Sequence, residues 1–382
     1  MIKKLIEKEI KIDKLVHRGL GLGHKNGRTF MVYYSLPGEI VDAEIIMTKK
    51  SYSVGKVSKI HNSSIHRTNP ICEYYQVCGG CQLLHTSYQF QLEAKRNILK
   101  ELLFRATKKE FNVKYTGSDP NLGYRLRAQF LVKRAKVGYT KFNSNDFVRI
   151  DKCHICHNKI NEAINHLNKT ISSTELGRLY IATDGNNIAT FPIKDYDNHL
   201  KIDINGYSYI LKPHIFFQAN IYTLDILQRE VIPNNTKGRV AIDFYAGSGF
   251  FSLPLSKDFE LVLSIEESPE AHSILKENIL INKISNIKTI NSSVEDTDIS
   301  KQYLCPDLII LDPPRAGMSK NAIHKVLNIR PKRIVYVSCD PATLSRDISY
   351  FLKNSFHVEE IILIDQFPQT FHFETVVKLL EN

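Results

Sequence analysis

The sequence contains no run of about 18 apolar residues, the length a helix needs to cross a membrane. Its first residues, Met1-Ile2-Lys3-Lys4, are followed by alternating charged and apolar residues, unlike the apolar core of a secretion signal. The seven cysteines are an odd number and are unevenly spread, which argues against a disulfide-stabilised scaffold and for a reducing compartment. We therefore expect a cytoplasmic protein, without membrane association and monomeric.

Positive charge is in excess. The 51 Lys and Arg residues outnumber the 40 Asp and Glu residues, which gives a net charge of +11 and an isoelectric point near 9.1. Such a balance favours a polyanionic partner, nucleic acid before a membrane surface, although a solvated basic surface gives the same count. The length of 382 residues predicts two to three domains, and the apolar content of 43% is ample for large cores.

The first segment, residues 1–64, has the pattern of a small β-barrel. Alternating apolar and polar residues recur between turn signals, over Glu9–Val16, Arg28–Tyr34, Glu39–Ile46 and Ser53–Ile60. This spacing predicts a barrel of the OB type, which commonly binds oligonucleotides, with a purely structural barrel as the alternative. The glycines at 19, 21 and 23 precede no helical pattern, so they predict a tight hairpin turn and not a dinucleotide site. Lys49 and Lys50 form a basic edge suited to phosphates.

Three cysteines follow within ten residues. Cys72, Cys78 and Cys81 have the spacing C-x5-C-x2-C, and two intervening glycines let the backbone fold tightly. Three thiols so spaced can converge on one soft-ligand metal centre, either tetrahedral zinc or a four-iron iron–sulfur cluster. Either Cys153 or Cys156 could supply a fourth thiol.

Residues 65–205 are predicted to form a small β-rich central domain. Residues 88–111 have a helical period and predict a connecting helix. Residues 124–132 predict a strand on which Arg125 and Arg127 share one face. Two arginines so placed suit an RNA backbone or base, although a solvated edge would have the same pattern.

Residues 206–382 alternate strands and helices, which predicts a doubly wound, Rossmann-like parallel sheet. Its first strand ends in Asp243-x-Tyr245-x-Gly247-x-Gly249, and the second ends on Glu266. Gly-x-Gly without a third glycine favours S-adenosylmethionine over a pyrophosphate cofactor, and an acid at the next strand end can hold its ribose hydroxyls. An ordinary acid at a helix start is the alternative for Glu266.

Two more predicted strands end on reactive side chains. The apolar run 308–311 ends at Asp312, and the run 334–338 ends at Cys339 before Asp-Pro blocks the strand. Open α/β sheets bind ligands at this edge, whereas a lone buried cysteine is commonly a core residue. His372 and Glu374 follow near the end of the chain.

Together these motifs resemble the RNA uracil-5-methyltransferase family, in its order and at its spacings. The matching stretches are Phe216-Phe217-Gln218-x-Asn220, Asp243-x-Tyr245-x-Gly247-x-Gly249, Asp312-Pro-Pro-Arg315-x-Gly317, Ser338-Cys339-Asp-Pro-x-Thr343 and Phe367-Pro368-x-Thr370-x-His372-x-Glu374. The cysteine motif is similar to the iron–sulfur motif of that family. The first segment resembles the TRAM domain, an RNA-binding barrel, through Arg18-Gly19-x-Gly21, Leu36-Pro37-Gly38-Glu39 and Lys49-Lys50-x-Tyr52.

The resemblance implies a class I methyltransferase that transfers a methyl group from S-adenosylmethionine to carbon 5 of a uridine in RNA. Cys339 would be the nucleophile, and Glu374 the general base with His372 as competitor. The donor would be held by Gln218, Tyr245, Gly247, Gly249, Glu266, Asp312 and Ser293, where Ser293 stands at a position that often carries Asp or Asn in the family. A structural 4Fe-4S cluster would be held by Cys72, Cys78, Cys81 and Cys153, with Cys156 as the alternative to Cys153.

Possession of both barrel and cluster resembles the ribosomal RNA branch of the family more than the transfer RNA branch. We therefore expect 23S ribosomal RNA as substrate before transfer RNA. Cytosine-5 methylation also uses an attacking cysteine, but the Phe-Pro-x-Thr-x-His-x-Glu motif argues against it. A non-catalytic RNA-binding protein that kept the fold is the alternative from another class.

Overall fold

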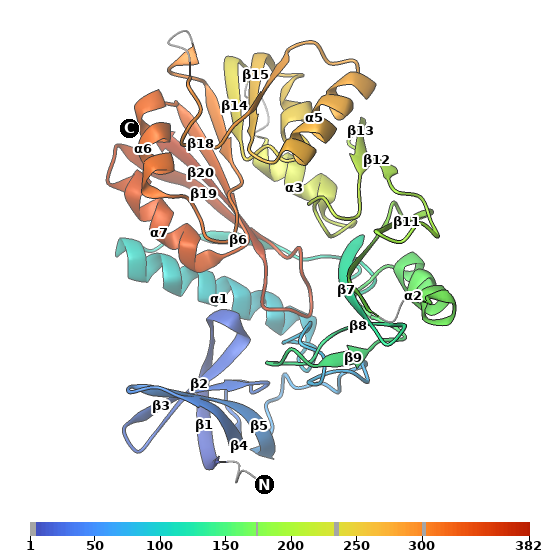
Figure 1. Ribbon diagram of the computed structural model, residues 1–382. Coiled ribbons are helices and arrows are strands. Elements are labelled where there is room, and N and C mark those ends of the chain that lie inside the picture. The colour runs from blue at the N-terminus through green and yellow to red at the C-terminus, as the bar shows by residue number, and fades with distance from the viewer. Residues whose placement is uncertain (1–4, 173–174, 233–236, 300–302) are drawn as a thin grey trace.

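The computed structural model describes residues 5–172, 175–232, 237–299 and 303–382 (Figure 1). A β-barrel lies at one end of the molecule and an eight-stranded sheet at the other, with helix α1 between them and a smaller sheet beside α1. None of the described helices is long and apolar enough to cross a membrane.

The N-terminal barrel is closed, with the strand order β1-β2-β3-β5-β4. Its elements are β1 (Ile6–Val16), the 3-10 turn η1 (His17–Gly19), β2 (Leu20–Lys25), β3 (Arg28–Tyr33), β4 (Ile40–Thr48) and β5 (Tyr52–Asn62). Alternate apolar residues such as Ile10, Phe30 and Val41 fill its interior. The predicted barrel is confirmed, but the hairpin turn was misplaced. The turn lies at Asn26-Gly27, whereas Gly23 belongs to β2, where an added Cβ would stand 2.2 Å from the carbonyl oxygen of Lys11.

The central segment forms one helix and a five-stranded antiparallel sheet of order β11-β10-β7-β8-β9. Its elements are α1 (Tyr88–Thr107), β6 (Val113–Thr116), β7 (Arg127–Lys133), β8 (Lys136–Thr140), β9 (Phe147–Arg149), α2 (Asn158–Thr170), β10 (Glu175–Thr183) and β11 (Ile188–Phe191). The apolar face of α2, with Ile160, Ile164 and Leu167, packs on this sheet.

The large sheet has the order β16-β15-β14-β17-β18-β20-β19-β6. Before most of its strands in the chain, β12 (Leu200–Ile204) and β13 (Tyr207–Leu211) form a separate two-stranded sheet. The elements that follow are α3 (Leu224–Val231), β14 (Gly238–Phe244), α4 (Ser252–Leu255), β15 (Phe259–Glu266), α5 (Pro269–Ile281), β16 (Ile287–Asn291), β17 (Leu308–Leu311), α6 (Lys320–Ile329), β18 (Arg333–Ser338), α7 (Pro341–Leu352), β19 (Phe356–Ile364) and β20 (Glu374–Glu381). The strands from β16 to β18 are parallel, whereas β20 is antiparallel to both neighbours. This is the Rossmann-like arrangement that the sequence predicts.

The chain does not divide cleanly at residue 206. Strand β6, from the central segment, extends the large sheet by pairing in parallel with β19, so that Val113 lies beside Ile361. The boundary also falls in the turn of the β12–β13 hairpin, whose side chains, such as Tyr209, pack in the core of the large sheet. The sheet is therefore completed by residues outside the predicted range 206–382.

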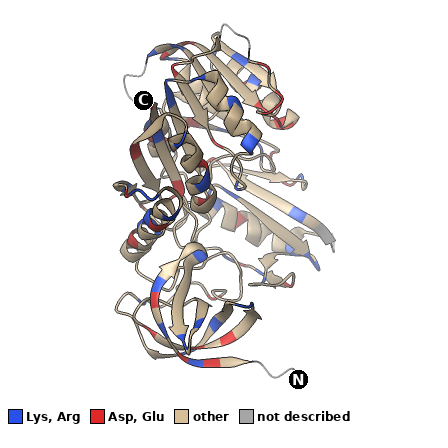
Figure 2. Cartoon of the chain, turned by 90° about the vertical axis from the view of Figure 1, so that its left-hand side faces the viewer, with Lys and Arg blue, Asp and Glu red and all other residues tan. Residues whose placement is uncertain are grey.

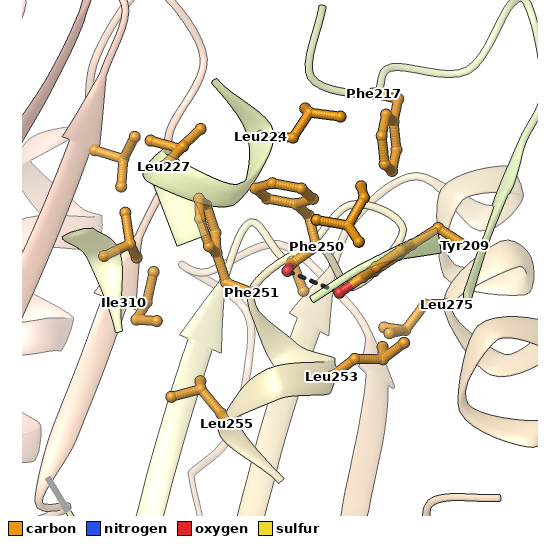
Figure 3. Packing of buried hydrophobic residues seen from close by; sticks show 14 of the residues in the cluster. Tyr209, Phe217, Leu224, Leu227, Phe250, Phe251, Leu253, Leu255, Leu275 and Ile310 are labelled. Carbon is orange, nitrogen blue, oxygen red and sulfur yellow. Dashed lines mark hydrogen bonds between the residues drawn. The ribbon is translucent and has the colours of Figure 1, made fainter. Parts of the chain in front are cut away.

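Each face of the large sheet carries its own core. On one face Phe217, Phe250 and Phe251 pack together (Figure 3). The buried Tyr209 hydroxyl donates to the carbonyl oxygen of Phe250 at 3.3 Å. Ile310 and Val337 belong to this face, and Leu99 of α1 belongs to the core on the other. Because side chains alternate along a strand, Asp312 and Cys339 follow on from Ile310 and Val337 toward the first face.

Candidate active site and cysteine-lined cavity

The predicted site residues meet at the carboxyl edge of the parallel strands. Glu266 ends β15, Asp312 follows β17, and Cys339 follows β18. Glu374 begins β20, which runs antiparallel beside β18 and brings its first residue to the same edge. The strand order reverses between β14 and β17, and this is where open α/β sheets form their ligand crevice.

Cys339 is half-buried between β18 and the N-terminus of α7, where Asp340 caps the helix through the backbone N–H groups of Ala342 and Thr343. Burial and the carboxyl groups of Glu374 and Asp312 raise the pKa of its thiol to about 12, while the Arg315 guanidinium opposes them. A thiol at a strand end beside two carboxyl groups is unlike an inert core cysteine.

Two carboxyl groups stand beside this thiol. Burial and the charge of Asp312 raise the pKa of Glu374 well above its usual value, and Glu374 Oε2 is a buried atom without a partner among the described residues. Burial and Asp243 raise the pKa of Asp312 to about 7. The Gln218 amide lies 3.5 Å from Asp312 Oδ2, which joins the Phe216-Phe217-Gln218 stretch to this edge. Such crowded acids are typical of proton-transfer sites.

Arg315 is a residue that the sequence analysis did not assign to the site. Its guanidinium lies near enough to the Cys339 thiol to oppose the rise in the thiol's pKa. Its backbone carbonyl accepts from Thr343 Oγ1 of α7 at 3.1 Å, so the loop after β17 is fixed to the helix after Cys339. Its place three residues after Asp312, in the same loop, was the signal that could have identified it.

His372 and the barrel also reach this edge. Burial and nearby cations lower the pKa of His372 to about 3, which leaves its imidazole neutral. From the barrel, His17 Nε2 lies 3.6 Å from Asp340 Oδ2, and its ring meets the ring of Phe371 edge-on. The barrel therefore contacts the residue that directly follows Cys339.

The turn after β14 has the geometry of a donor-binding turn. Tyr245, Gly247 and Gly249 all have positive φ, and no atom lies within 4 Å of a Cβ built on Gly247. Glu266 stabilises this turn, because its carboxylate accepts from the backbone N–H groups of Gly247 and Ser268, each at 2.7 Å. Each of these oxygens keeps a lone pair for a ribose hydroxyl, so turn and acid fit a nucleoside such as that of S-adenosylmethionine.

Ser293 lies after β16, at the same edge but farther from Cys339 in the strand order. Its hydroxyl donates to Asp296 Oδ2 at 2.7 Å and accepts from the backbone N–H of Asp296 at 3.1 Å. Its predicted role at the donor's adenine stays a prediction.

A separate cavity of about 240 Å³ lies between the cysteine segment and the central sheet. Of its described lining residues, four are cysteines, namely Cys72, Cys78, Cys81 and Cys153. Cys156 does not belong to these four; it is buried in the core under α2, with its Sγ 3.9 Å from the Tyr139 hydroxyl. As they are placed, no three His, Cys, Asp or Glu side chains within the described ranges form a metal-binding group.

A backbone N–H group donates to one of the cavity sulfurs, from Gly80 to Cys78 Sγ at 3.4 Å. The N–H groups of Tyr75 and Cys156 donate to the carbonyl oxygens of Cys72 and Cys153, each at 3.1 Å. An all-thiol lining has the donor chemistry that zinc or an iron–sulfur cluster takes, but the described side chains are not arranged as a metal-binding group. The iron–sulfur cluster stays a prediction.

Arg125 and Arg127 do not form the open arginine face that the sequence predicts. Strand β7 begins only at Arg127, and Arg125 lines the cysteine cavity with its Nε donating to the Arg127 carbonyl at 2.9 Å. Arg127 Nε donates to the Pro213 carbonyl at 2.7 Å. Both guanidinium groups are thus used inside the protein, and the predicted RNA contacts of these residues stay predictions.

Lys49 and Lys50 are exposed in the turn between β4 and β5, where the Lys49 amide donates to the Tyr52 carbonyl at 2.8 Å. In Figure 2, basic and acidic residues are interleaved over the barrel and the helices, so the positive excess is spread out in this view. The lysine pair offers phosphates an accessible contact, and RNA binding there stays a prediction.

Comparison with known proteins gives matches along nearly the whole chain. A family model described as tRNA (uracil-5-)-methyltransferase matches residues 181–382. An uncharacterized RNA methyltransferase of Caldanaerobacter subterraneus subsp. tengcongensis is 32% identical over 96% of this chain and 96% of its own length. A 23S rRNA (uracil(1939)-C(5))-methyltransferase of Shewanella amazonensis is 27% identical over 97% of this chain and 95% of its own.

A solved structure has the same fold. The tRNA (uracil-54, C5)-methyltransferase of Pyrococcus abyssi, in complex with S-adenosyl-L-homocysteine, superimposes with a TM-score of 0.77. The sequence identity is 24%, and the match covers 98% of this chain and 99% of that one.

Proposed function

The chain belongs to the tRNA (uracil-5-)-methyltransferase family, and from this premise we propose that it methylates carbon 5 of a uridine in RNA through a covalent bond to Cys339. The methyl donor is S-adenosylmethionine. The observation that carries the proposal is the meeting of Cys339, Glu374 and Asp312 at one sheet edge, beside the turn after β14.

The chemistry requires a nucleophile because carbon 5 of uracil reacts poorly with a sulfonium methyl group. Cys339 Sγ, as the thiolate, adds to carbon 6 and forms an S–C6 bond, and the electron pair of the C5=C6 bond moves toward O4. The resulting enolate makes carbon 5 nucleophilic. Arg315 assists because its guanidinium lowers the pKa of the thiol and thus favours the thiolate.

Carbon 5 then takes the methyl group, and S-adenosylhomocysteine leaves with the electron pair of the broken sulfur–methyl bond. Glu374 removes the remaining proton from carbon 5, the C5=C6 bond re-forms, and the S–C6 bond breaks to release Cys339. The raised pKa of Glu374 makes its carboxylate a stronger proton acceptor. His372, whose pKa is about 3, is the weaker base, which supports Glu374 in this role.

The donor would be held by the turn at Tyr245, Gly247 and Gly249, with Glu266 on its ribose. Gln218 and Asp312 would lie at its reactive end, since their side chains approach each other next to Cys339. When bound, the donor supplies the methyl group and a positive sulfonium. Ser293 would approach the adenine from the end of β16.

The cysteine cavity is proposed to hold a 4Fe-4S cluster on Cys72, Cys78, Cys81 and Cys153. Its four thiols and the Gly80 amide that donates to Cys78 Sγ support such a group, and the position of Cys156 outside the cavity lining supports Cys153 as the fourth ligand. The group would hold the cysteine segment against the central sheet. Its role would be structural, because Glu374 and Cys339 belong to a different site.

The proposed substrate is 23S ribosomal RNA, with transfer RNA as the second candidate. The relative from Shewanella amazonensis, named for ribosomal RNA, matches nearly the whole chain, but so does the structure from Pyrococcus abyssi, named for transfer RNA. The barrel would contact RNA around the target base, which must be unpaired or flipped out of a helix to reach Cys339.

The test is methylation in vitro with labelled S-adenosylmethionine and separated ribosomal and transfer RNA from a strain that lacks the protein. We expect label in large-subunit RNA, recovered as 5-methyluridine after nuclease digestion. Label only in transfer RNA would overturn the substrate assignment, and label on cytosine would overturn the reaction.

A further inference from the structure

The loop that carries the general base is held by a helix outside the methyltransferase sheet. Residues 365–373 connect β19 to β20 and end at Glu374, and in Figure 1 this connection descends in red from the sheet toward α1. Helix α1 precedes the whole methyltransferase segment in the chain. Glu374 begins β20 and pairs with Ile364 of β19, so this loop leads directly into the strand end that carries the base.

Gln91 of α1 forms a reciprocal amide pair with Gln369. Its Oε1 accepts from the Gln369 backbone N–H at 2.9 Å, and its Nε2 donates to Gln369 Oε1 at 2.9 Å. Gln91 is fully buried, and Gln369 has a φ of +69°, a left-handed conformation that is costly for a residue other than glycine. The glutamine pair therefore helps to hold the loop in a bend that it would not adopt by itself.

One turn farther along α1, Lys95 holds the start of the same loop. Its ammonium donates to Asp365 Oδ1 at 2.7 Å and to the Phe367 carbonyl at 3.2 Å, and its side chain is 1% exposed. Charges are rarely buried unless they are paired, and the removal of one partner leaves the other unpaired in the interior. Gln91 and Lys95 thus fix both ends of the stretch 365–369 from one face of α1.

The cysteine segment adds a third attachment. The backbone N–H groups of Gln82 and Leu83, directly after Cys81, donate to the Gln369 carbonyl at 3.1 and 2.9 Å. Gln91 Nε2 also donates to the Leu83 carbonyl at 3.1 Å. The same glutamine therefore joins the end of the cysteine motif to the loop before Glu374.

We propose that Gln91 and Lys95 are positioning residues for Glu374, and that they act in the last step of the reaction. This inference depends on the proposed function, in which Glu374 removes the carbon-5 proton. Cys339, which acts first, directly follows β18 and precedes the Asp340 cap of α7, so other elements than this loop carry it. A loosened loop should slow proton removal more than addition to carbon 6, and the methylated RNA should stay attached to Cys339.

The experiment compares Gln91→Met with Gln89→Met, a matched change at an exposed position of the same helix. Labelled RNA and S-adenosylmethionine are mixed with each variant, and RNA–protein adducts are resolved on a denaturing gel. For Gln91→Met we expect turnover to fall by about 10- to 100-fold, because small displacements of a catalytic group cost rates of this size. We also expect the adduct fraction to rise at least about fivefold and the KM for RNA to change less than about threefold. Gln89→Met should match the wild type.

A purely structural role would lower adduct formation and turnover together, and this outcome would overturn the proposal. Gln91→Glu keeps an acceptor for the Gln369 amide but loses the donor, so its turnover and adduct fraction should lie between those of Gln91→Met and the wild type. It replaces Gln91→Met in the comparison if that variant does not fold. Lys95→Met should also accumulate adduct. If the wild type methylates no RNA and Glu374→Gln traps no adduct, the proposed function fails, and with it this inference.

Discussion

The molecule places its thiols in two opposite surroundings. Cys72, Cys78, Cys81 and Cys153 line one cavity, and the backbone N–H of Gly80 donates to Cys78 Sγ. At the sheet edge, Cys339 faces two carboxyl groups, with Arg315 as the cation that opposes them. Four thiols that line one cavity can give up their protons to a shared cation, whereas carboxyl neighbours keep a thiol protonated until it reacts.

The difference teaches that cysteine chemistry is set by the groups that face the sulfur and not by burial alone. Cys81 and Cys339 are both partly buried, and burial raises the pKa of both thiols. Only Cys339 has a proton acceptor as its neighbour. We therefore expect changes at the two places to have different readouts, one in covalent chemistry and one in metal content.

The largest effect is expected for Cys339→Ala. Without a nucleophile the C5=C6 bond cannot be activated, so methylation should fall by at least about 10⁴-fold while donor binding is unchanged. Single-turnover transfer of labelled methyl groups and calorimetric titration with S-adenosylhomocysteine measure the two quantities. Cys305→Ala, at an exposed thiol, is the control and should keep full activity. Methylation by Cys339→Ala would show that Cys339 is not the nucleophile.

The second effect is expected for Glu374→Gln, which keeps the shape of the side chain but cannot accept the carbon-5 proton. Turnover should fall by about 10²- to 10⁴-fold, the usual contribution of a general base. Addition of Cys339 should persist, so a covalent RNA–protein adduct should accumulate on a denaturing gel. His372→Gln is the matched change at the competing base. If His372→Gln trapped the adduct and Glu374→Gln did not, His372 and not Glu374 would be the general base.

The third prediction concerns the cavity. Cys153→Ser removes a proposed ligand and should lower affinity for the metal group by about 100-fold or more, whereas Cys156→Ser should leave it unchanged. Iron and zinc content of anaerobically purified protein, with visible absorbance before and after dithionite, measures this without any activity assay. Equal loss in both variants would contradict the choice of Cys153, and zinc in place of iron would contradict the cluster.

The smallest effect is expected for Arg315→Met. Because Arg315 lowers the pKa of Cys339, its loss should raise that pKa and reduce the thiolate at neutral pH, with a roughly tenfold lower single-turnover rate. The reactive form is deprotonated and the thiol pKa is about 12, so the rate should rise with pH between about 6.5 and 9.5 in both proteins. Arg315→Lys keeps the charge and should recover most of the loss. An identical rate in Arg315→Met would show that Arg315 has no such role.

Strand ends were the part of the site that the sequence could predict. Apolar runs that end on Glu266, Asp312 and Cys339 place these side chains at the carboxyl edge of any parallel sheet, and the structure brings them there. The barrel was equally predictable, because its alternation has a period of two. These inferences need only the local periodicity of the sequence and the rule that the carboxyl ends of parallel strands lie at the same edge of the sheet.

The parts that were not predicted depend on contacts between distant residues. Strand β6 has only four residues, too few for a periodic pattern to be recognised, and its place follows from pairing with β19. Arg125 precedes β7, and its backbone forms isolated β-bridges with Cys156 and Asn220. These contacts place Arg125 at the cysteine cavity. The pairing of Gln91 with Gln369 joins residues 278 positions apart, which no local pattern shows.

The position of β6 at the edge of the large sheet has a consequence for biosynthesis. Val113 leaves the ribosome long before Ile361, its neighbour in the sheet, so β6 has no strand to pair with until nearly the whole chain has been made. An N-terminal barrel can close early, since all its strands lie within residues 6–62. The central sheet can also form early, since β7 to β11 lie within residues 127–191. The large sheet is completed late and leaves the edge at β6 unpaired until β19 is made.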